Sequence, residues 1–280
     1  MRIDAHQHFW RYVPERDTWI TPEMSLLRRN FLPAEFSEEL RLNDIEASIA
    51  VQADQSEAET EFLLALAAQD PTIAGVVGWV DLRSAGLRDR LQYFSRFPKL
   101  SGFRHIVQSE RNDKFLLEED FLRGIALLSG FGFTYDILIY PRQLPVAVEF
   151  ARKFGQQKFV LDHMAKPAIK SEDIREWAAQ IKALAELPNV YCKVSGLVTE
   201  AAGKDWKFSD FTPYLDVAFA AFGTHRLMFG SDWPVCLLAG SYASVKAIVA
   251  NYMKGFSGRD RDEVFGLNAH RFYERKVSPL

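Results

Sequence analysis

The chain has 280 residues, enough for two average domains or for one α/β barrel of ordinary size. Its composition is 48% hydrophobic and 25% charged with a net charge of −3, which gives no reason to expect nucleic acid or an anionic membrane surface as a partner. No apolar run approaches the roughly 20 residues that cross a bilayer, two cysteines are too few for a disulfide framework, and the first residues form no signal-peptide pattern. These features predict a cytoplasmic enzyme.

Apolar runs typical of buried parallel strands alternate along the chain with amphipathic patterns typical of helices. After a first strand within residues 1–9, the strand-like runs occupy residues 47–52, 74–80, 100–106, 134–139, 158–162, 190–195 and 226–231. The helical patterns occupy residues 57–69, 142–154, 171–187, 209–222, 242–253 and 259–275. Ser171 and Ser209 are expected helix starts, because each offers a hydroxyl cap followed by acidic or polar residues.

This alternation, with no Gly/Ser-rich linker to divide it, predicts one fold class. We expect a distorted (β/α)8 TIM-like barrel that forms a single domain over residues 1–280, with a long first loop. The alternative is an open doubly wound sheet, but no GxGxxG motif follows the first strand.

The first connection, from Phe9 to about Ile45, is the longest, and its first part is rich in aromatic residues and proline. In a barrel this segment follows strand one and lies on the face where active sites form. It is either a lid or pocket wall above the site, or a structural excursion that packs Trp10 and Trp19 against the barrel rim.

The first strand ends in His6 and His8, which a two-residue spacing places on the same side of an extended chain. Two such imidazoles can bind a metal ion or stabilise a developing oxyanion. Taken alone, the pair would more often be exposed and without function, because short motifs match by chance. In the predicted barrel, however, His163 and Asp232 also follow strands, so the four residues form a group able to activate water.

Further polar and aromatic side chains follow the predicted strands and would surround the same mouth. We expect the following to bind substrate: Gln52, Trp79, Arg104, His105, Lys193 and Trp233, with Asp136 as a further group. The alternative for each is a structural hydrogen bond at the barrel mouth. We favour that alternative for Asp136 and Lys193, and substrate binding for Arg104 and His105.

Five stretches of the chain resemble the amidohydrolase superfamily, in particular its branch of sugar lactonases, which includes L-fuconolactonases and rhamnonolactonase-like proteins. They are IDAHQHFW at 3–10, GFRH at 102–105, FVLDHMAKP at 159–167, NVYCKVSG at 189–196 and LMFGSDWP at 227–234. Together and in this order they are highly specific for the branch, and they extend over the whole predicted barrel. The resemblance implies a distorted (β/α)8 barrel and hydrolytic chemistry in carbohydrate catabolism.

The resemblance also implies a metal site, but the chain departs from the usual ligand set. The superfamily's ligands are typically the His-x-His pair, a Lys or Glu on strand four, histidines on strands five and six, and the aspartate of strand eight. Here strand four offers an arginine and a histidine, and strand five has no histidine, so a two-metal centre is not expected. Two interpretations stay open: a single divalent ion, with zinc as the candidate, held by His6, His8 and Asp232, or a metal-independent site. If the predicted strand count is one too high, His163 becomes the missing histidine and zinc is favoured.

The substrate implied by the resemblance is a small-molecule sugar lactone, such as L-fucono-, L-galactono-, D-arabinono- or L-rhamnono-lactone, which is opened to the aldonic acid. Water would attack the ring carbonyl with Asp232 as general base, while His6, His8 and His163, or a metal that they hold, polarise the carbonyl. One alternative is a zinc-dependent decarboxylase, which would need the missing strand-five histidine. Another is a pyrone-dicarboxylate-type lactonase, which would need several arginines where Arg104 is the one convincing candidate. A binding protein without catalysis is the alternative from a different class, and the joint presence of the four site residues argues against it.

Overall fold

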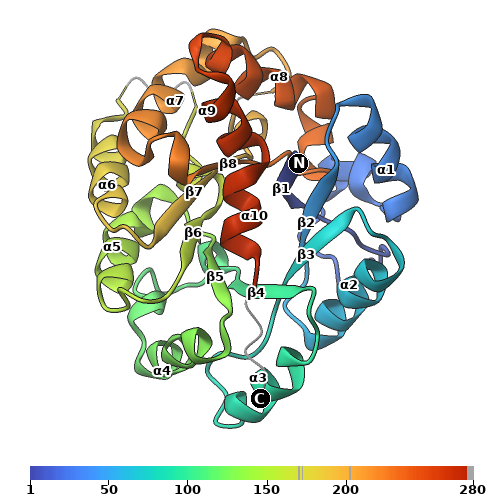
Figure 1. Ribbon diagram of the computed structural model, residues 1–280, viewed down its shortest axis with the longest axis vertical. Coiled ribbons are helices and arrows are strands. Elements are labelled where there is room, and N and C mark those ends of the chain that lie inside the picture. Colours follow the sequence, from blue (N-terminus) through green and yellow to red (C-terminus); the bar gives the residue numbers. More distant parts are fainter. Residues whose placement is uncertain (170, 172, 202, 276–280) are drawn as a thin grey trace.

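The computed structural model describes residues 1–169, 171, 173–201 and 203–275. Within them, eight parallel strands form one sheet in which each strand pairs with the next along the chain (Figure 1). They are β1 (Ile3–Gln7), β2 (Ala47–Val51), β3 (Ile73–Gly78), β4 (Leu100–His105), β5 (Thr134–Ile137), β6 (Phe159–Leu161), β7 (Val190–Val194) and β8 (Leu227–Phe229). A bridge between Gln7 and Trp233 joins the first strand to the segment after the last, so the sheet nearly closes.

The (β/α)8 TIM-like barrel predicted from the sequence is therefore confirmed. The strand count is also confirmed, and His163 follows the sixth strand rather than the fifth. The interpretation in which this histidine fills the missing strand-five position is wrong.

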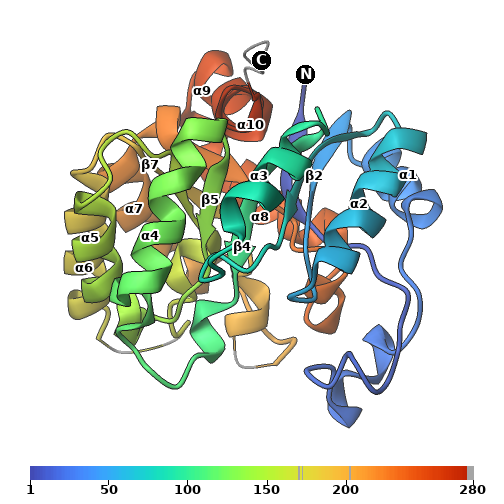
Figure 2. The same ribbon diagram turned by 90° about the horizontal axis from the view of Figure 1, so that it is seen from below.

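Helices follow the strands and surround the barrel (Figure 2). They are α1 (Pro33–Leu42), α2 (Glu57–Gln69), α3 (Leu87–Ser95), α4 (Glu119–Leu128), α5 (Leu144–Arg152), α6 (Arg175–Ala185), α7 (Phe208–Phe222), α8 (Tyr242–Tyr252), α9 (Gly258–Asp262) and α10 (Asn268–Tyr273). α2 has the predicted bounds, and its start is capped by the Ser56 hydroxyl, which accepts the N–H of Glu59 at 3.1 Å. Three of these helices, α1, α3 and α4, were not predicted from the sequence. Over the described part of the chain, no helix combines the length and apolar character needed to span a membrane.

Two predicted helix starts are wrong, because side-chain oxygens bind the backbone in a different way at each of them. The Ser171 hydroxyl accepts the N–H of Asp173 at 3.3 Å in a turn, and α6 begins only after that turn. α7 begins before Ser209, and the carboxylate of Asp210 closes its first turn by accepting the N–H of Lys207 at 2.9 Å. Residue 172 of the predicted helix lies outside the described residues, as do residues 276–280 of the predicted domain.

The last predicted helix, residues 259–275, is interrupted. A π-helical turn, Glu263–Leu267, separates α9 from α10. Gly266 in this turn lies against the start of the chain, where an added Cβ would sit 2.2 Å from the carbonyl oxygen of Met1 and 2.9 Å from the Cα of Arg2. The interruption lets α10 lie across the N-terminal end of the barrel, where it packs on inward-facing side chains of the strands. The packed residues include Ala269, Phe272 and Tyr273 from α10 and Ile3, Ile49, Val77, Val160 and Met228 from the strands.

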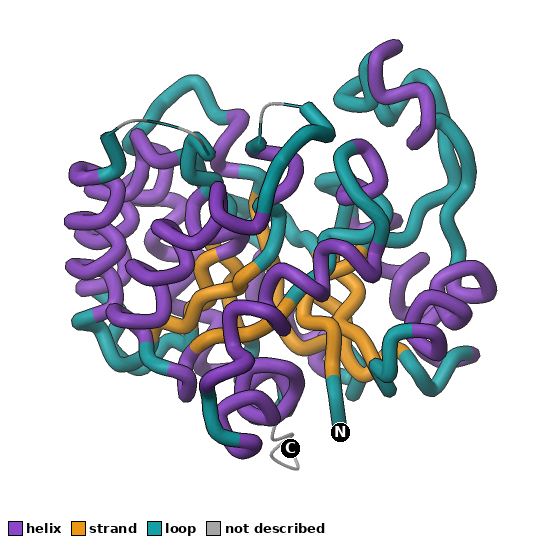
Figure 3. Tube along the Cα trace, turned by 90° about the horizontal axis from the view of Figure 1, so that it is seen from above, coloured by secondary structure: helices purple, strands orange, loops and turns teal. Residues whose placement is uncertain are grey.

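The first connection packs at its base and extends at its tip. Trp10 is buried, and its ring lies 5.2 Å from that of Phe31 and 5.7 Å from that of Trp19 between centroids. Trp10 therefore packs within the connection itself, and these contacts do not test whether the segment packs against the barrel rim. The segment between Trp10 and Phe31 stands away from the barrel on the side opposite the N-terminus, as Figures 2 and 3 show. A lid function for this segment stays a prediction.

We predict that Gly266→Ala lowers the free energy of unfolding by about 1–3 kcal/mol, because its methyl group would overlap the backbone that begins β1. Urea unfolding followed by circular dichroism measures the change. Gly258→Ala is the matched control, since a Cβ there meets nothing within 4 Å. Similar losses in the two variants would contradict the proposed close approach.

Candidate active site

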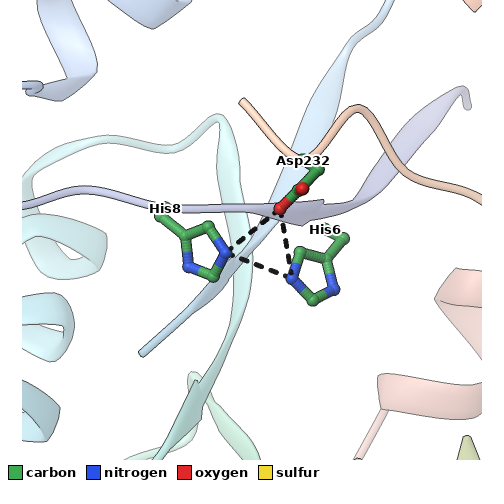
Figure 4. A group of neighbouring side chains, drawn as sticks. All are labelled: His6, His8 and Asp232. Carbon is green, nitrogen blue, oxygen red and sulfur yellow. Dashed lines mark hydrogen bonds and ion pairs between the residues drawn. The ribbon is translucent and has the colours of Figure 1, made fainter. Parts of the chain in front are cut away.

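His6, on β1, and His8, which follows β1 directly, meet inside the barrel at its C-terminal end. β1 is buried along its length, and the Nε2 atoms of His6 and His8 lie 3.2 Å apart (Figure 4). The Nδ1 of His8 lies 2.7 Å from the carbonyl oxygen of Val51. Because a carbonyl oxygen only accepts, this nitrogen carries the proton, and the Nε2 of a neutral His8 keeps its lone pair for the site.

Asp232 follows β8 with a left-handed backbone, φ 58°. Its N–H donates to the carbonyl oxygen of His6 at 2.8 Å, and the N–H of His8 donates to that of Trp233 at 2.7 Å. These bonds direct the carboxylate towards the histidines, with Oδ1 3.4 Å from the Nε2 of His8 and 3.9 Å from that of His6. Burial raises the pKa of Asp232, but His163, His8 and His6 more than offset that effect, so the net pKa lies below its ordinary value. The side chain is a carboxylate at neutral pH.

The buried carboxyl of Asp4 connects β1 with the segment that carries Asp232. The register of β1 against β2 shifts just after Asp4, and its carboxylate accepts the hydroxyl of Tyr242, on α8, at 3.0 Å. Its other oxygen accepts the N–H of His6 at 3.0 Å and that of Ser231 at 2.9 Å. Burial raises the pKa of Asp4 to about 6, although its hydrogen bonds oppose the shift. One buried carboxyl thus connects the first strand to the residue before Asp232.

A left-handed turn after β6 carries His163. Residues 163–166 are not glycine, yet all four have φ between 50° and 60°. This conformation costs roughly 1–2 kcal/mol per residue. Trp177, on α6, holds the turn by donating its indole N–H to the carbonyl oxygen of Met164 at 2.9 Å. Strain that the surroundings maintain in this way is typical of functional segments.

His163 faces Asp232 and lies beside His6, with the two ring centroids 4.4 Å apart. Its Nε2 lies 4.0 Å from the Oδ1 of Asp232, and its Nδ1 lies 2.8 Å from the hydroxyl of Ser195. Gly196, with φ 65°, packs so closely on the ring that a Cβ would lie 2.7 Å from Nδ1. Burial lowers the pKa of His163 to about 4, although Asp232 opposes the shift. The imidazole is therefore neutral at neutral pH.

A buried set of charges lies behind His6. The Nζ of Lys193 lies 2.6 Å from Asp136, 3.0 Å from Asp162 and 3.1 Å from the Nδ1 of His6. Arg104 donates to the other oxygen of Asp162 at 2.9 Å. Burial raises the pKa of Asp162, but the charges of Lys193 and His6 outweigh burial, so the pKa lies well below its usual value. For Asp136 the effect of burial is the larger one, and the pKa rises to about 6. The charges of two cations, Lys193 and Arg104, are therefore balanced by two acidic groups, Asp136 and Asp162, inside the barrel.

The structure places several predicted substrate-binding residues in internal contacts. Arg104 is only 3% exposed and donates to the side-chain oxygen of Gln52 at 2.8 Å, and Lys193 belongs to the buried charge set. For Lys193 this arrangement is the structural alternative that we favoured. Direct contact of these three side chains with substrate stays a prediction.

His105, Trp79 and Trp233 also have partners of their own. The indole N–H of Trp79 donates to the Nδ1 of His105 at 3.3 Å, and the Nε2 of His105 lies 2.7 Å from Glu110. Trp233 is buried with its ring centroid 4.7 Å from that of Phe36. The structure brings Trp79 and His105 together at one side of the barrel, whereas the ring of Trp233 packs against Phe36. Substrate binding by these three residues stays a prediction.

Sequence reasoning missed Asp162 and Glu200 as site residues. The position of Asp162, at the end of β6 and next to His163, was an available signal. Glu200 follows β7 in an irregular connection, with its carboxylate 3.8 Å from the Nζ of Lys166. Burial raises the pKa of Glu200. The charge of Lys166 lowers this pKa, and the charge of Asp232 raises it further. No sequence pattern marks Glu200, because its electrostatic interaction with Asp232 depends on the loop conformation.

The residues fit a single divalent ion. His6, His8 and Asp232 each offer one ligand atom, and these atoms lie within 4.8 Å of one another; His6, Asp162 and His163 form a second such group. In the first group a histidine lone pair and a carboxylate oxygen lie 3.4 Å apart, and a cation between them would satisfy both acceptors. Nitrogen and carboxylate ligands are those of catalytic zinc sites. Because the two groups share His6, they do not form two independent sites.

A (β/α)8 barrel that carries a His-x-His pair on its first strand and an aspartate after its last has the architecture of a barrel hydrolase. A family model described as Amidohydrolase matches residues 3–275, and the chain belongs to this family. It is 42% identical to the L-fucono-1,5-lactonase of Burkholderia multivorans, with 98% of this chain and 96% of the relative covered. It is 35% identical to the L-fucono-1,5-lactonase of Burkholderia ambifaria, over 97% and 95% of the two chains. A crystal structure of an amidohydrolase from Burkholderia multivorans with bound zinc superimposes with a TM-score of 0.94 at 43% identity, covering 99% of this chain and 100% of that one.

We predict that Asp4→Ala lowers the free energy of unfolding by about 3 kcal/mol, because three buried donors lose their acceptor. Asp4→Asn keeps an oxygen that can accept the two N–H groups and should lose less. Urea unfolding of the two variants and the wild type measures the difference. Equal losses would show that an amide oxygen does not replace the carboxylate as acceptor of the two N–H groups.

Proposed function

We propose that this chain, acting as a single domain over residues 1–280, is a sugar lactonase that opens an aldonolactone of the L-fucono-1,5-lactone type to the aldonic acid. The observation that carries the proposal is the centre itself, in which the ionised Asp232 lies within 4.0 Å of three buried imidazoles. The 42% identity to an L-fucono-1,5-lactonase over nearly the whole of both chains supports the choice of substrate class. The other aldonolactones of the L-galactono, D-arabinono and L-rhamnono type belong to the same class.

Asp232 is the proposed general base. Its carboxylate takes a proton from water as the water oxygen bonds to the ring carbonyl carbon, which gives a tetrahedral oxyanion. When this intermediate collapses, the bond from the carbonyl carbon to the ring oxygen breaks. Asp232 then returns the proton to the departing ring oxygen, which becomes a hydroxyl of the open-chain acid. The low pKa of Asp232 keeps the carboxylate available across the neutral range.

The three histidines serve the carbonyl oxygen. His163 is neutral at neutral pH, and if its Nδ1 accepts the hydroxyl of Ser195, its Nε2–H points towards Asp232 and the reacting atoms. We propose that His6, His8 and Asp232 hold one divalent ion, with zinc as the candidate. Such an ion supplies positive charge that polarises a carbonyl oxygen as a Lewis acid.

A panel of lactones tests this function. We expect turnover of L-fucono-1,5-lactone and related aldonolactones, detected by the acid released, and a loss of about 100-fold or more in kcat for Asp232→Asn, because an amide takes no proton from water. Circular dichroism checks that the variant folds. Asp89→Asn, which changes an exposed carboxylate on α3, is the matched control and should retain wild-type kcat. Turnover of dicarboxylates or amides alone would refute the sugar-lactone assignment, and near wild-type kcat in Asp232→Asn would remove its role as base.

Elemental analysis tests the single ion. Protein loaded with zinc and then dialysed should retain about one ion per chain, because the two candidate ligand groups share His6. His8→Gln should lower this occupancy, whereas His270→Gln, on α10 at the other end of the barrel, should not. Two tightly bound ions that are both needed for activity would contradict the shared site, and full activity after complete chelation would show that the histidines act without metal.

A further inference from the structure

His6 is the one imidazole of the centre with charged groups at both ring nitrogens. On the Nδ1 side, the Nζ of Lys193 lies at 3.1 Å and the Oδ1 of Asp162 at 3.4 Å. On the Nε2 side, the Nε2 of His8 lies at 3.2 Å and the Nη1 of Arg104 at 3.3 Å. A neutral imidazole carries one proton, so each nitrogen can satisfy only one kind of neighbour.

Lys193 determines which nitrogen is the acceptor. Its ammonium only donates, and it donates to Asp136 at 2.6 Å and to the Nδ1 of His6 at 3.1 Å. His6 then carries its proton on Nε2. That proton has an acceptor, because the proton of His8 is engaged by Val51 and its Nε2 lone pair faces His6 at 3.2 Å. The Lys193–His6–His8 contacts therefore form a consistent donor-to-acceptor series.

Arg104 does not reverse this assignment. Its Nη1 lies 3.3 Å from the Nε2 of His6, but it already donates to Asp162 at 2.9 Å. Its other nitrogens bond to Gln52, with the Nη2 contact to the side-chain oxygen at 2.8 Å. The guanidinium therefore has partners without the His6 lone pair.

This arrangement leaves one buried acceptor without a donor. Among the described residues, none donates a hydrogen bond to the Oδ1 of Asp162, although Lys193 lies 3.0 Å from it as an ion pair. That oxygen lies 3.4 Å from the Nδ1 of His6 and is fully buried. A proton on Nδ1 would give it a donor. The Nδ1–H form is also the one that frees the Nε2 lone pair towards His8 and Asp232 (Figure 4).

We propose that Lys193 and Asp162 compete for the Nδ1 of His6, so that the metal-free protein holds His6 as the Nε2–H tautomer and binding of a divalent ion converts it to the Nδ1–H tautomer. In the first state Lys193 donates to Nδ1. In the second state the Nε2 lone pair would be available to the ion: the Nε2 proton passes to water, and Nδ1 takes up from water a proton that faces Asp162. His6 is neutral in both states. Lys193 and Asp162 are thus positioning residues that act on the ion through His6. This inference rests on the single-ion site proposed above.

Nitrogen-15 NMR of the histidine side chains tests the assignment directly, because the two nitrogens of a neutral imidazole differ by tautomer. The chain has only six histidines, and His6→Gln identifies the His6 signals by their loss. We expect the Nε2–H pattern in metal-free wild type and the Nδ1–H pattern after zinc is added. An Nδ1–H pattern in the metal-free protein, or no change with zinc bound, would overturn the proposal.

A charge-balanced variant tests the competition. Asp136→Asn with Lys193→Met removes one acid and one ammonium together, so the buried region keeps Asp162 opposite Arg104. We expect the Nδ1–H tautomer already in the metal-free double variant and a zinc Kd about ten-fold tighter than wild type, measured by competition with a chelator. Asp136→Asn alone keeps Lys193 and should retain the wild-type tautomer. A general structural lesion would weaken zinc binding, so an unchanged or weaker Kd in the folded double variant would overturn the proposal.

The outcomes separate this inference from the proposed function. The wild-type spectra need no variant, so the tautomer is tested even if the double variant fails to fold. A wild-type protein that takes up no zinc would overturn both the exchange and the single-ion site. Lactone turnover measured on the same sample shows independently whether the hydrolytic function holds.

Discussion

The balance between two buried cations and two buried acidic groups is the interaction on which the centre depends. Four successive strands each contribute one charge, with Arg104 from β4, Asp136 from β5, Asp162 after β6 and Lys193 from β7. Loss of one member would leave an uncompensated buried charge, which costs roughly 3–5 kcal/mol. The set also reaches the floor of the barrel, where the hydroxyl of Tyr273 donates to Asp136 at 2.7 Å. The helix that covers one end of the barrel is thereby connected to the site at the other end.

Backbone strain is concentrated where the catalytic groups are presented. His163 and Asp232 both have left-handed backbones, and both follow strands. The surrounding contacts compensate for the unfavourable conformation, through Trp177 on one turn and through the backbone bonds to β1 on the other. From these strained positions the Nε2 of His163 and the Oδ1 of Asp232 lie 4.0 Å apart, so the strain coincides with the site.

Asp232 and Trp233 are adjacent in the loop after β8, but their side chains point in different directions. Asp232 turns into the centre, whereas Trp233 turns outward and packs with Phe31 and Phe36 beneath the first connection. The buried ring fixes the position of the loop, and the carboxylate next to it benefits from that rigidity. The first connection therefore supports the site at its base, whatever its exposed tip contributes.

The sequence by itself determined the order of the eight strands, the barrel and the group of His6, His8, His163 and Asp232. Buried parallel strands are recognisable as apolar runs, and polar residues that follow such runs must gather at one end of a barrel. Some helix boundaries differ from the prediction. The Ser171 hydroxyl bonds to the backbone in a turn instead of capping a helix, and Gly266 contacts the start of the chain. A pattern of apolar spacing predicts neither contact.

Only the tertiary structure decided which polar side chains bind one another instead of facing the mouth. Lys193 and His6 are 187 positions apart, and Arg104 and Asp162 are 58 positions apart. Their pairing depends on the register between strands and on how far each side chain is buried, and no local segment of the sequence carries that information. Burial removes water as a partner, so these charges pair with one another, and that pairing places Lys193 and Asp162 at His6.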